Sequence, residues 1–257
     1  MLLTALPLVL ALGSGPVSDT RDWCDQHGGD DQARHCDVRE IDLGAVRSVS
    51  VDAEPNGGIA VEGVDGTQAR LWVKVEGRGA TDEEARALAS QVRIETDGTI
   101  RATGPQTRGR RGWHASFRLQ VPRATELRLT TGNGGITLRN TTGVARLDAV
   151  NGGLHLSGLG GQVDARTVNG GVHLSLTGDG WSGDGLEATT TNGGLHVEVD
   201  ETYRARLQVS TVNGRMKVGF PVTLQGSIGK TLSLDLAGGG PELRIRTTNG
   251  SVSIDRP

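Results

Sequence analysis

The sequence predicts an all-β protein, a parallel β-solenoid (β-helix) with about 18–23 residues per coil. Three observations support this fold: a recurring Asn-Gly turn, alternating apolar residues on both sides of it, and a composition with 40 Gly and only 3% aromatic residues. The turns contain Asn56, Asn133, Asn151, Asn169, Asn192, Asn213 and Asn249. From Asn133 onward the separations are 18, 18, 23, 21 and 36 residues, which is typical of stacked repeats.

The residues that flank each turn predict one strand before it and one strand after it. Counted from the Asn, positions −6 and −4 and positions +3 and +5 are apolar, and polar residues lie between them. Such alternation indicates strands with one buried face. Asn tolerates positive φ angles and Gly prefers them, so we expect such angles in the turns.

Two architectures fit this pattern, a chain of β-hairpins and a parallel solenoid. Position −2 favours the solenoid, because it is Thr in every repeat from Asn133 onward except one, where it is Ala149. Identical residues at one register would stack about 4.8 Å apart and hydrogen-bond along the axis. The gap between Asn213 and Asn249 is twice 18 residues, which predicts a coil that has lost its Asn, with a strand around residues 232–236.

The segments before the regular repeats are expected to differ from them. Residues 1–20 resemble a signal peptide, although no Lys or Arg precedes Arg21, and residues 21–40 form a polar segment, a loop or cap. Residues 41–257 form the solenoid, irregular over 41–125 and regular over 126–257. Thr81 and Glu84 form a capping box that predicts one short helix near 81–91, which could cover an open end of the solenoid.

Two cysteines, Cys24 and Cys36, follow the signal-like segment. In an exported protein they most simply form one disulfide; a metal site with His27 and His35 is the alternative. We therefore expect a periplasmic, cell-surface or extracellular location. The net charge of −3 and the pI of about 6.1 give no indication of a nucleic-acid partner, and the sequence predicts no cofactor.

The strand from Phe117 to Pro122 and the strand and turn from Leu127 to Ile136 resemble the bacterial putative-adhesin family of β-strand-repeat proteins. Members share a strand that ends in Val-Pro, followed by repeats of strand, Thr-x-Asn-Gly and strand. The resemblance spans roughly Val46 to Ile254. It implies a β-solenoid that is exported or tethered to a membrane, in a domain of unknown function. It implies no catalytic residue, because none is established for the family.

A histidine row is the sharpest candidate site. Position +4 faces outward and is His155, His173 and His196 in three successive repeats, so the solenoid would align the three imidazoles about 4.8 Å apart. Imidazoles at that spacing could share a transition-metal ion. The alternative is an exposed register filled by residues that are merely tolerated.

A charge lattice is the second candidate. Arg146 would lie beside Asp164, and Asp148 beside Arg166, on adjacent coils. We interpret these pairs as structural, since cross-strand ion pairs help to set register. A catalytic carboxylate pair, as in polysaccharide-cleaving β-helices, is the alternative, but neighbouring arginines oppose the raised pKa that a general acid needs.

Two Gly-rich loops are further candidates for ligand contact. The loop 178–185 carries Trp181, Asp179 and Asp184, so it could stack on a sugar or hold Ca²⁺. The loop 108–114 carries Arg110, Arg111 and Trp113, and it could contact anionic lipid headgroups or glycans. The alternatives are a Trp folded back on the solenoid and a solvated hairpin tip.

Together these features predict an exported, non-enzymatic, adhesin-like interaction module of the cell surface or envelope. A surface glycan, an envelope protein or a membrane surface would be its partner. Two alternatives are an envelope-associated accessory or sensory domain that binds a partner protein, and a carbohydrate-active β-helix enzyme. The enzyme would need a carboxylate cluster without arginine partners, and the sequence shows none.

Overall fold

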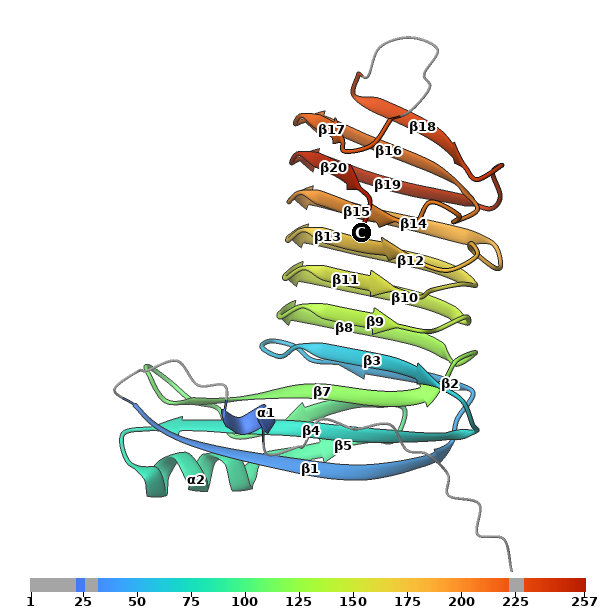
Figure 1. Ribbon diagram of the computed structural model, residues 1–257. Helices are drawn as coiled ribbons and strands as arrows, with labels where there is room; N and C mark the ends of the chain where they lie inside the picture. The colour runs from blue at the N-terminus through green and yellow to red at the C-terminus, as the bar shows by residue number, and fades with distance from the viewer. Residues whose placement is uncertain (1–21, 26–31, 222–228) are drawn as a thin grey trace, which may run out of the picture.

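Two ten-stranded sheets that lie face to face form the described part of the molecule (Figure 1). The computed structural model describes residues 22–25, 32–221 and 229–257. The predicted signal segment 1–20 and His27 lie outside these residues. Besides the strands, the described residues form two helices, α1 (Asp22–Asp25) and α2 (Asp82–Gln91).

Each sheet has its own strand order. Sheet A runs, in spatial order, β1 (Ala33–Ala45), β4 (Gln68–Gly79), β7 (Gly112–Pro122), β3 (Ile59–Val64), β9 (Ile136–Arg139), β11 (Leu154–Ser157), β13 (Val172–Leu176), β15 (Leu195–Val199), β20 (Val252–Asp255) and β17 (Met216–Val218). Sheet B runs β18 (Thr231–Leu236), β16 (Ala205–Asn213), β19 (Glu242–Asn249), β14 (Gly185–Asn192), β12 (Gln162–Asn169), β10 (Val144–Asn151), β8 (Glu126–Asn133), β2 (Ser48–Asp52), β6 (Thr99–Thr103) and β5 (Arg93–Glu95).

The strands on the two sides of each Asn-Gly turn belong to different sheets. For example, β10 pairs in parallel with β8 and β12 in sheet B, while β11 pairs in parallel with β9 and β13 in sheet A. A hairpin would pair β10 with β11, so the hairpin alternative is wrong. The prediction of an all-β, parallel-rich, solenoid-like fold is confirmed.

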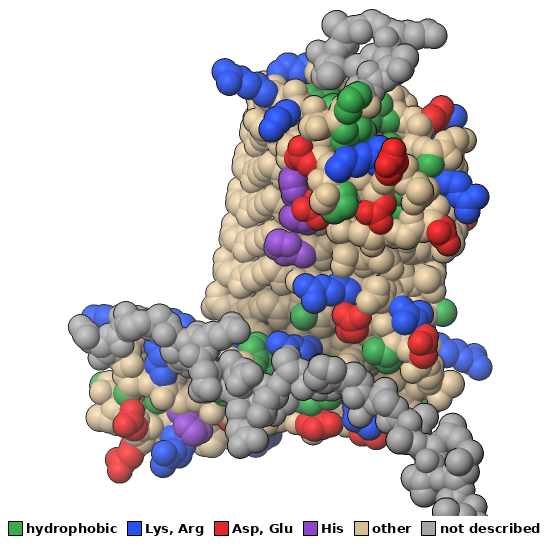
Figure 2. Space-filling model, viewed as in Figure 1, with side chains coloured by type: hydrophobic (Ala, Val, Ile, Leu, Met, Phe, Trp, Pro, Cys, Tyr) green, Lys and Arg blue, Asp and Glu red, His purple; other side chains and the backbone are tan. Residues whose placement is uncertain are grey.

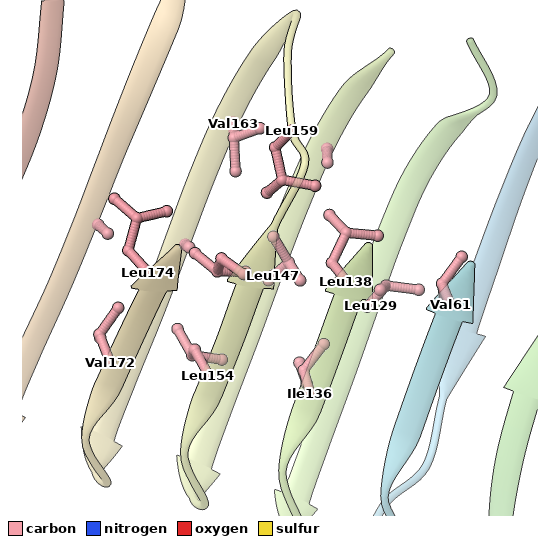
Figure 3. Packing of buried hydrophobic residues seen from close by; sticks show 14 of the residues in the cluster. Val61, Leu129, Ile136, Leu138, Leu147, Leu154, Leu159, Val163, Val172 and Leu174 are labelled. Atoms are coloured by element: carbon pink, nitrogen blue, oxygen red, sulfur yellow. The ribbon is translucent and has the colours of Figure 1, made fainter. Parts of the chain in front are cut away.

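The core lies between the sheets, where the alternating apolar residues of both meet. Leu129 and Leu147 of sheet B and Ile136, Leu138 and Leu154 of sheet A are all completely buried (Figure 3). Each fully buried aliphatic side chain of this size contributes about 1.5–3 kcal/mol of transfer free energy. The predicted inward positions are therefore the ones that hold the two sheets together.

The turn glycines are needed for space and not for a positive φ angle. None of the Asn or Gly residues of the Asn-Gly turns has a positive φ, so that expectation is wrong. A Cβ built on the first glycine, for example Gly134 or Gly152, would overlap the backbone carbonyl of the adjacent turn. On the second glycine of the same two turns it would lie 3.1 and 3.2 Å from the nearest atom, so this position tolerates a side chain. That difference explains why Ser251 and Arg215 occupy the second position in two of the turns.

The buried Thr at position −2 stabilises the contact between adjacent turns. Thr131, Thr167, Thr190, Thr211 and Thr247 each donate a hydrogen bond from Oγ1 to the carbonyl of the first turn glycine in the neighbouring coil, at 2.6–2.8 Å. A buried hydroxyl without a partner would be costly, so this bond makes Thr acceptable in the core. Ala149, at the same position of its repeat, is the exception, because it has no hydroxyl to donate such a bond.

The coil that ends the chain is inserted between two earlier coils. β19 pairs with β14 on one side and with β16 on the other, and β20 likewise lies between β15 and β17. β18 pairs antiparallel with β16 at the end of sheet B. The strand expected around residues 232–236 is confirmed as β18. Its expected place in a parallel coil is wrong, because it forms an antiparallel end strand (Figure 1).

The N-terminal end of the stack is built from long antiparallel strands. β4 pairs antiparallel with both β1 and β7, and these strands extend beyond the width of the regular coils (Figure 1). β1 begins at Ala33, so residues 33–40 form a strand where we expected a loop or cap. β1 pairs with β4 along the full length of β4, and the sequence pattern gave no indication of this pairing.

The predicted helix is confirmed as α2, which packs against β1 and β4. Thr81 caps its N-terminus, since Thr81 Oγ1 accepts a hydrogen bond from the Glu84 amide at 3.2 Å. The Glu84 carboxylate accepts from the Ala80 amide at 2.7 Å. Within the described ranges, neither helix has the length and apolar character that crossing a bilayer requires.

The two turn glycines should respond differently to the same substitution. Gly152→Ala places a methyl group against the Gly134 carbonyl, so we expect it to destabilise the fold by about 3 kcal/mol. Gly153→Ala meets its nearest backbone atom at 3.2 Å, and we expect a cost of about 1 kcal/mol or less. Urea unfolding of both variants measures the difference. Equal losses would contradict the close-approach explanation.

Ala149 is the position at which a Thr would complete the series of hydroxyl-to-carbonyl hydrogen bonds between adjacent turns. Its register partners are Thr131 and Thr167, so the hydroxyl of Ala149→Thr should donate to the Gly134 carbonyl. Ala149→Val has nearly the same shape and no hydroxyl, which makes it the matched control. We expect the Thr variant to be more stable than the Val variant by about 1 kcal/mol, measured by thermal or urea unfolding. If the Val variant were the more stable one, the free energy of unfolding at this position would depend on filled volume and not on the hydrogen bond.

Candidate functional site

A continuous asparagine ladder runs along the edge where sheet B turns into sheet A. Every Asn after the first donates from Nδ2 to Oδ1 of the Asn that precedes it in the stack, at 2.8–3.0 Å. The spatial order is Asn56, Asn133, Asn151, Asn169, Asn192, Asn249 and Asn213. Because each amide between the two ends both donates and accepts, the ladder holds neighbouring turns in register.

The histidine row lies on the outer face of sheet A, next to that ladder. His155, His173 and His196 occupy one register of β11, β13 and β15. Ring centroids are 5.8 Å apart for His155 and His173, which stack, and 4.7 Å apart for His173 and His196, which meet edge to face. Figure 2 shows histidine side chains gathered in a column over the stacked strands.

Two carboxylates and a hydroxyl border this row. Glu198 Oε2 lies 3.6 Å from His173 Nε2, and Glu198 Oε1 lies 3.4 Å from His196 Nε2. On the other side of its ring, His196 Nδ1 lies 2.7 Å from Ser253 Oγ and 3.8 Å from Asp255 Oδ2. The sequence analysis aligned the histidines but missed Glu198, although its place two residues after His196 puts it on the same face.

His155, at the other end of the row, is exposed. The partial loss of hydration at this site lowers the pKa of His155 below its usual value. The neighbouring His173 and Arg139 lower it further. The carboxylates therefore lie at the His173–His196 end of the row, and we call His173, His196 and Glu198 the His-Glu triad.

The charge lattice lies on the outer face of sheet B. Arg146 is in register with Asp164, and Asp148 is in register with Arg166. The ion pairs converge on one carboxylate: Asp164 is 3.0 Å from Arg166 on its own strand and 3.8 Å from Arg146 on the next. An acid with a guanidinium group on each side has the surroundings of a surface ion pair, which suits a structural role.

The loop 178–185 does not present its tryptophan to solvent. Trp181 is 5% exposed and belongs to the core, and its Nε1 donates to the Gly161 carbonyl at 3.0 Å. The expectation of an exposed ring for sugar stacking is wrong, and the alternative of a Trp folded back on the solenoid is confirmed, because the ring belongs to the hydrophobic core. Asp179 and Asp184 are exposed, and neither belongs to a close group of three metal-ligating side chains within the described ranges.

The basic loop is held by contacts of its own. Arg111 pairs with Glu84 of α2, and the Arg110 carbonyl accepts a hydrogen bond from Gln32 at 3.1 Å. Trp113 is half-buried and donates from Nε1 to the Pro105 carbonyl at 2.9 Å. Arg110, Arg111 and Trp113 line one side of a surface groove, and the turn residue Asn133 is on that groove as well.

Cys24 and Cys36 form a disulfide that fastens α1 to β1, with a Cα–Cα distance of 5.8 Å. Both sulfur atoms are used in this bond, so the alternative metal site with His35 is not formed. The preceding Trp23 contacts the outer face of sheet A, where its ring lies 4.4 Å from the Arg118 guanidinium.

A buried carboxylate, Glu76, was missed by the sequence analysis. It is 4% exposed on β4, with Arg78 at 3.1 Å, Arg34 at 3.6 Å and His114 at 3.6 Å. From the alternation of the strand, the sequence predicts that Glu76 faces outward and is exposed. The packing of β1 and β7 on both sides of β4 buries it. Arg34 of β1 and Arg78 of β4 supply the opposite charge.

Comparison with known proteins supports the fold assignment. Residues 92–255, more than half of the chain, match the model of the family described as Toastrack DUF4097. The chain belongs to the Toastrack DUF4097 family. The resemblance to a bacterial putative-adhesin family of unknown function is thereby confirmed. No curated protein is similar enough to this chain to count as a relative.

Solved structures resemble the chain at low sequence identity. A putative cell adhesion protein from Clostridium sporogenes is 8% identical, with a TM-score of 0.41, over 87% of this chain and 100% of that one. A putative adhesin from Bacteroides fragilis is 12% identical, with a TM-score of 0.34, over 86% and 97%. A putative lipid binding protein from Parabacteroides distasonis is 11% identical, with a TM-score of 0.33, over 86% and 96%. Similarity at this level shows no shared ligand or activity.

The Toastrack match contains the histidine row and the ladder from Asn133 onward, whereas Asn56, α2 and the disulfide precede residue 92. The His-Glu triad and the Toastrack turns therefore lie in one structural unit. Of the cluster around Glu76, only His114 lies within the matched residues.

His114 provides a measurable test of the cluster around Glu76. Burial lowers the pKa of His114 below 6.5, and the positive charges of Arg78, Lys74 and Arg34 lower it further, while Glu76 opposes the shift. Since the folded pKa is below the unfolded one, the protein should lose stability as the pH falls below 6.5 toward the folded pKa. Histidine NMR titration should show a midpoint below 6.5, moving lower in Glu76→Gln.

The matching stability experiment uses His114→Gln. This variant should lose less stability than the wild type between pH 7 and pH 5, because it has no imidazole to protonate (a range around the ordinary His pKa of about 6.5). A His114 midpoint at or above 6.5 would contradict the dominance of burial.

Proposed function

We propose that this protein is an exported, non-enzymatic, adhesin-like module of the cell surface or envelope that binds its partner through a flat, rigid face. The face consists of the Asn-Gly turns at residues 133–135, 151–153, 169–171, 192–194 and 249–251, together with the adjoining histidine row. We call it the turn face. The proposal includes a coil of about 18–23 residues, which sets the spacing of these turns.

The observation that carries the proposal is the character of this face. Figure 2 shows a broad area of backbone and uncharged side chains on one side of the histidine column, whereas charged side chains lie on its other side and at the ends of the molecule. The asparagine ladder and the packed glycines hold the face in one conformation, so little conformational entropy is lost when a partner binds. A groove between the turn glycines and the histidines follows it.

Export is supported by the disulfide between Cys24 and Cys36, because such bonds persist in oxidising compartments. The signal-like segment 1–20 supports it independently. A surface glycan, an envelope protein and a membrane surface are the partner classes to be compared. The flat, neutral face favours a glycan or an envelope protein over a membrane surface, since anionic lipid is attracted by basic clusters.

The envelope-associated accessory domain is the second candidate, and the two differ in whether the partner is on the same cell. The carbohydrate-active enzyme has less support, because Asp164 lies between Arg146 and Arg166 and has the environment of a structural ion pair. A general acid in such an enzyme needs a raised pKa.

Side chains added to the turn face should block the proposed binding. Gly153→Arg is the variant of choice, because Ser251 already carries a Cβ at the same register within the stack and the added chain would cross the face. Thr130→Arg on the outer face of sheet B is the matched control, since Thr130 pairs with Asp148 and Asp52. We expect Gly153→Arg to weaken binding to envelope preparations by at least about tenfold, and Thr130→Arg to leave it unchanged.

The measurement uses labelled mature protein with whole cells, isolated envelope glycan and vesicles in parallel. It begins with fractionation of the producing cells, where we expect the full-length protein outside the cytoplasm. A cytoplasmic protein, or equal binding by both Arg variants, would contradict the proposal.

A further inference from the structure

We propose that the His-Glu triad, His173, His196 and Glu198, binds a divalent transition-metal ion such as Zn²⁺ on the outer face of sheet A. Among residues 22–25, 32–221 and 229–257, it is the one group of three or more His, Cys, Asp or Glu side chains whose ligand atoms all lie within 4.8 Å of one another. This inference does not rest on the turn face being a binding surface.

The separations between the ligand atoms fit a metal ion. Zn–N and Zn–O bonds are about 2.0–2.2 Å long, so two ligand atoms on a tetrahedral Zn²⁺ are about 3.4 Å apart. Glu198 lies 3.6 Å from His173 Nε2 and 3.4 Å from His196 Nε2. Both imidazoles thus point the same nitrogen at the same carboxylate. The side chains are 34–40% exposed, so they can rotate to close the remaining distance between the two nitrogens.

The strand pairing explains why the three residues converge. His173 and His196 are direct register partners on β13 and β15, which places their Cα atoms in adjacent strands of a parallel sheet. Glu198 follows His196 by two residues, and residues two apart in a strand point to the same face. His155, one strand further along, stacks on His173 with a centroid distance of 5.8 Å and makes none of the contacts to Glu198. The geometry therefore separates His155 from the ligands.

The hydrogen bonding of His196 also suits a ligand. A metal-binding imidazole commonly donates its other N–H to a neighbouring oxygen, which fixes the ring and makes the free nitrogen a better ligand. Ser253 Oγ lies 2.7 Å from His196 Nδ1, and Asp255 Oδ2 lies 3.8 Å from it. When Nδ1 carries the proton and donates to Ser253, Nε2 presents its lone pair to the side where Glu198 lies.

The inserted C-terminal coil supplies this support. If the coils followed one another in chain order, β17 would lie beside β15 and would place Lys217 next to His196. Instead β20 occupies that position, so Ser253 is the register partner of His196 and Lys217 is one strand further away. Asp255 is the register partner of Glu198 and adds negative charge near the cation.

Two histidines and one carboxylate leave coordination positions open toward solvent. Sites of this composition bind Zn²⁺ with a water molecule in the fourth position, and they also bind Fe²⁺. The open position would accept water or a donor atom from a ligand. The ligand set thus selects a transition metal over Ca²⁺ or Mg²⁺, which prefer oxygen ligands.

The test is a Zn²⁺ titration of the untagged, EDTA-treated and dialysed full chain by isothermal calorimetry at pH 7.5. We expect one site per chain with a dissociation constant in the micromolar range. His196→Gln and Glu198→Gln should each weaken binding by at least about tenfold, and Ser253→Ala by about tenfold through loss of the hydrogen bond to His196. Replacing His155 by Gln is the matched control in the same row, and this variant should keep the wild-type affinity.

Circular dichroism of each variant without metal verifies that it folds. We expect all variants to fold, because these side chains are partly exposed. Co²⁺ provides a second readout, because its visible absorption is strong only in tetrahedral or five-coordinate sites; the absorption should appear in the wild type and in His155→Gln and disappear in Glu198→Gln. Absence of Zn²⁺ binding by the wild type would overturn the proposal. Unchanged affinity in both His196→Gln and Glu198→Gln would also overturn it, since the metal would then bind elsewhere.

Discussion

The close approach of one turn backbone to the next is the constraint on which the rest of the structure depends. At the first glycine of each turn a side chain would occupy the position of the neighbouring carbonyl, so only Gly lets the coils stack at sheet spacing. Three sets of hydrogen bonds then use that spacing: the strand ladders, the threonine hydroxyls to the turn carbonyls, and the asparagine amides along the edge. Each would lose its geometry if the turns moved apart.

The inserted coil shows that stacking order is set by fit and not by chain order. The Asn249 turn repeats the same contacts with Asn192 on one side and Asn213 on the other. In return, the last coil of the chain is paired on both sides, and the exposed ends of the sheets are left to β18 and the short strand β17. At this end of the stack, an antiparallel strand closes sheet B and a three-residue strand closes sheet A. They offer little edge for a further parallel coil, which limits association at this end.

Much of this fold could be predicted from the sequence, because the repeat carries its own register. The inward residues, the parallel stacking and the helix at α2 follow from alternation, from the identity of Thr and Asn at fixed positions, and from a capping box. The position of the last coil could not be predicted, since identical turns fit equally well at any place in the stack. The reason for the glycines was also misjudged, because backbone space between coils does not show in a single turn.

For the candidate site, the same register predicted that the three histidines align, but it did not predict the side chains that contact them. Glu198 shares a strand with His196, so the sequence contained that signal. Ser253 and Asp255 are separated from His196 by more than 50 residues and approach it only because β20 is inserted. The triad therefore depends on two levels of structure: the turns align the imidazoles, and the inserted coil replaces a lysine beside them with a hydroxyl and a carboxylate. We therefore expect the proposed cation site to bind more weakly in a chain that ended before residue 252, because such a chain would lack Ser253 and Asp255 beside the ligands.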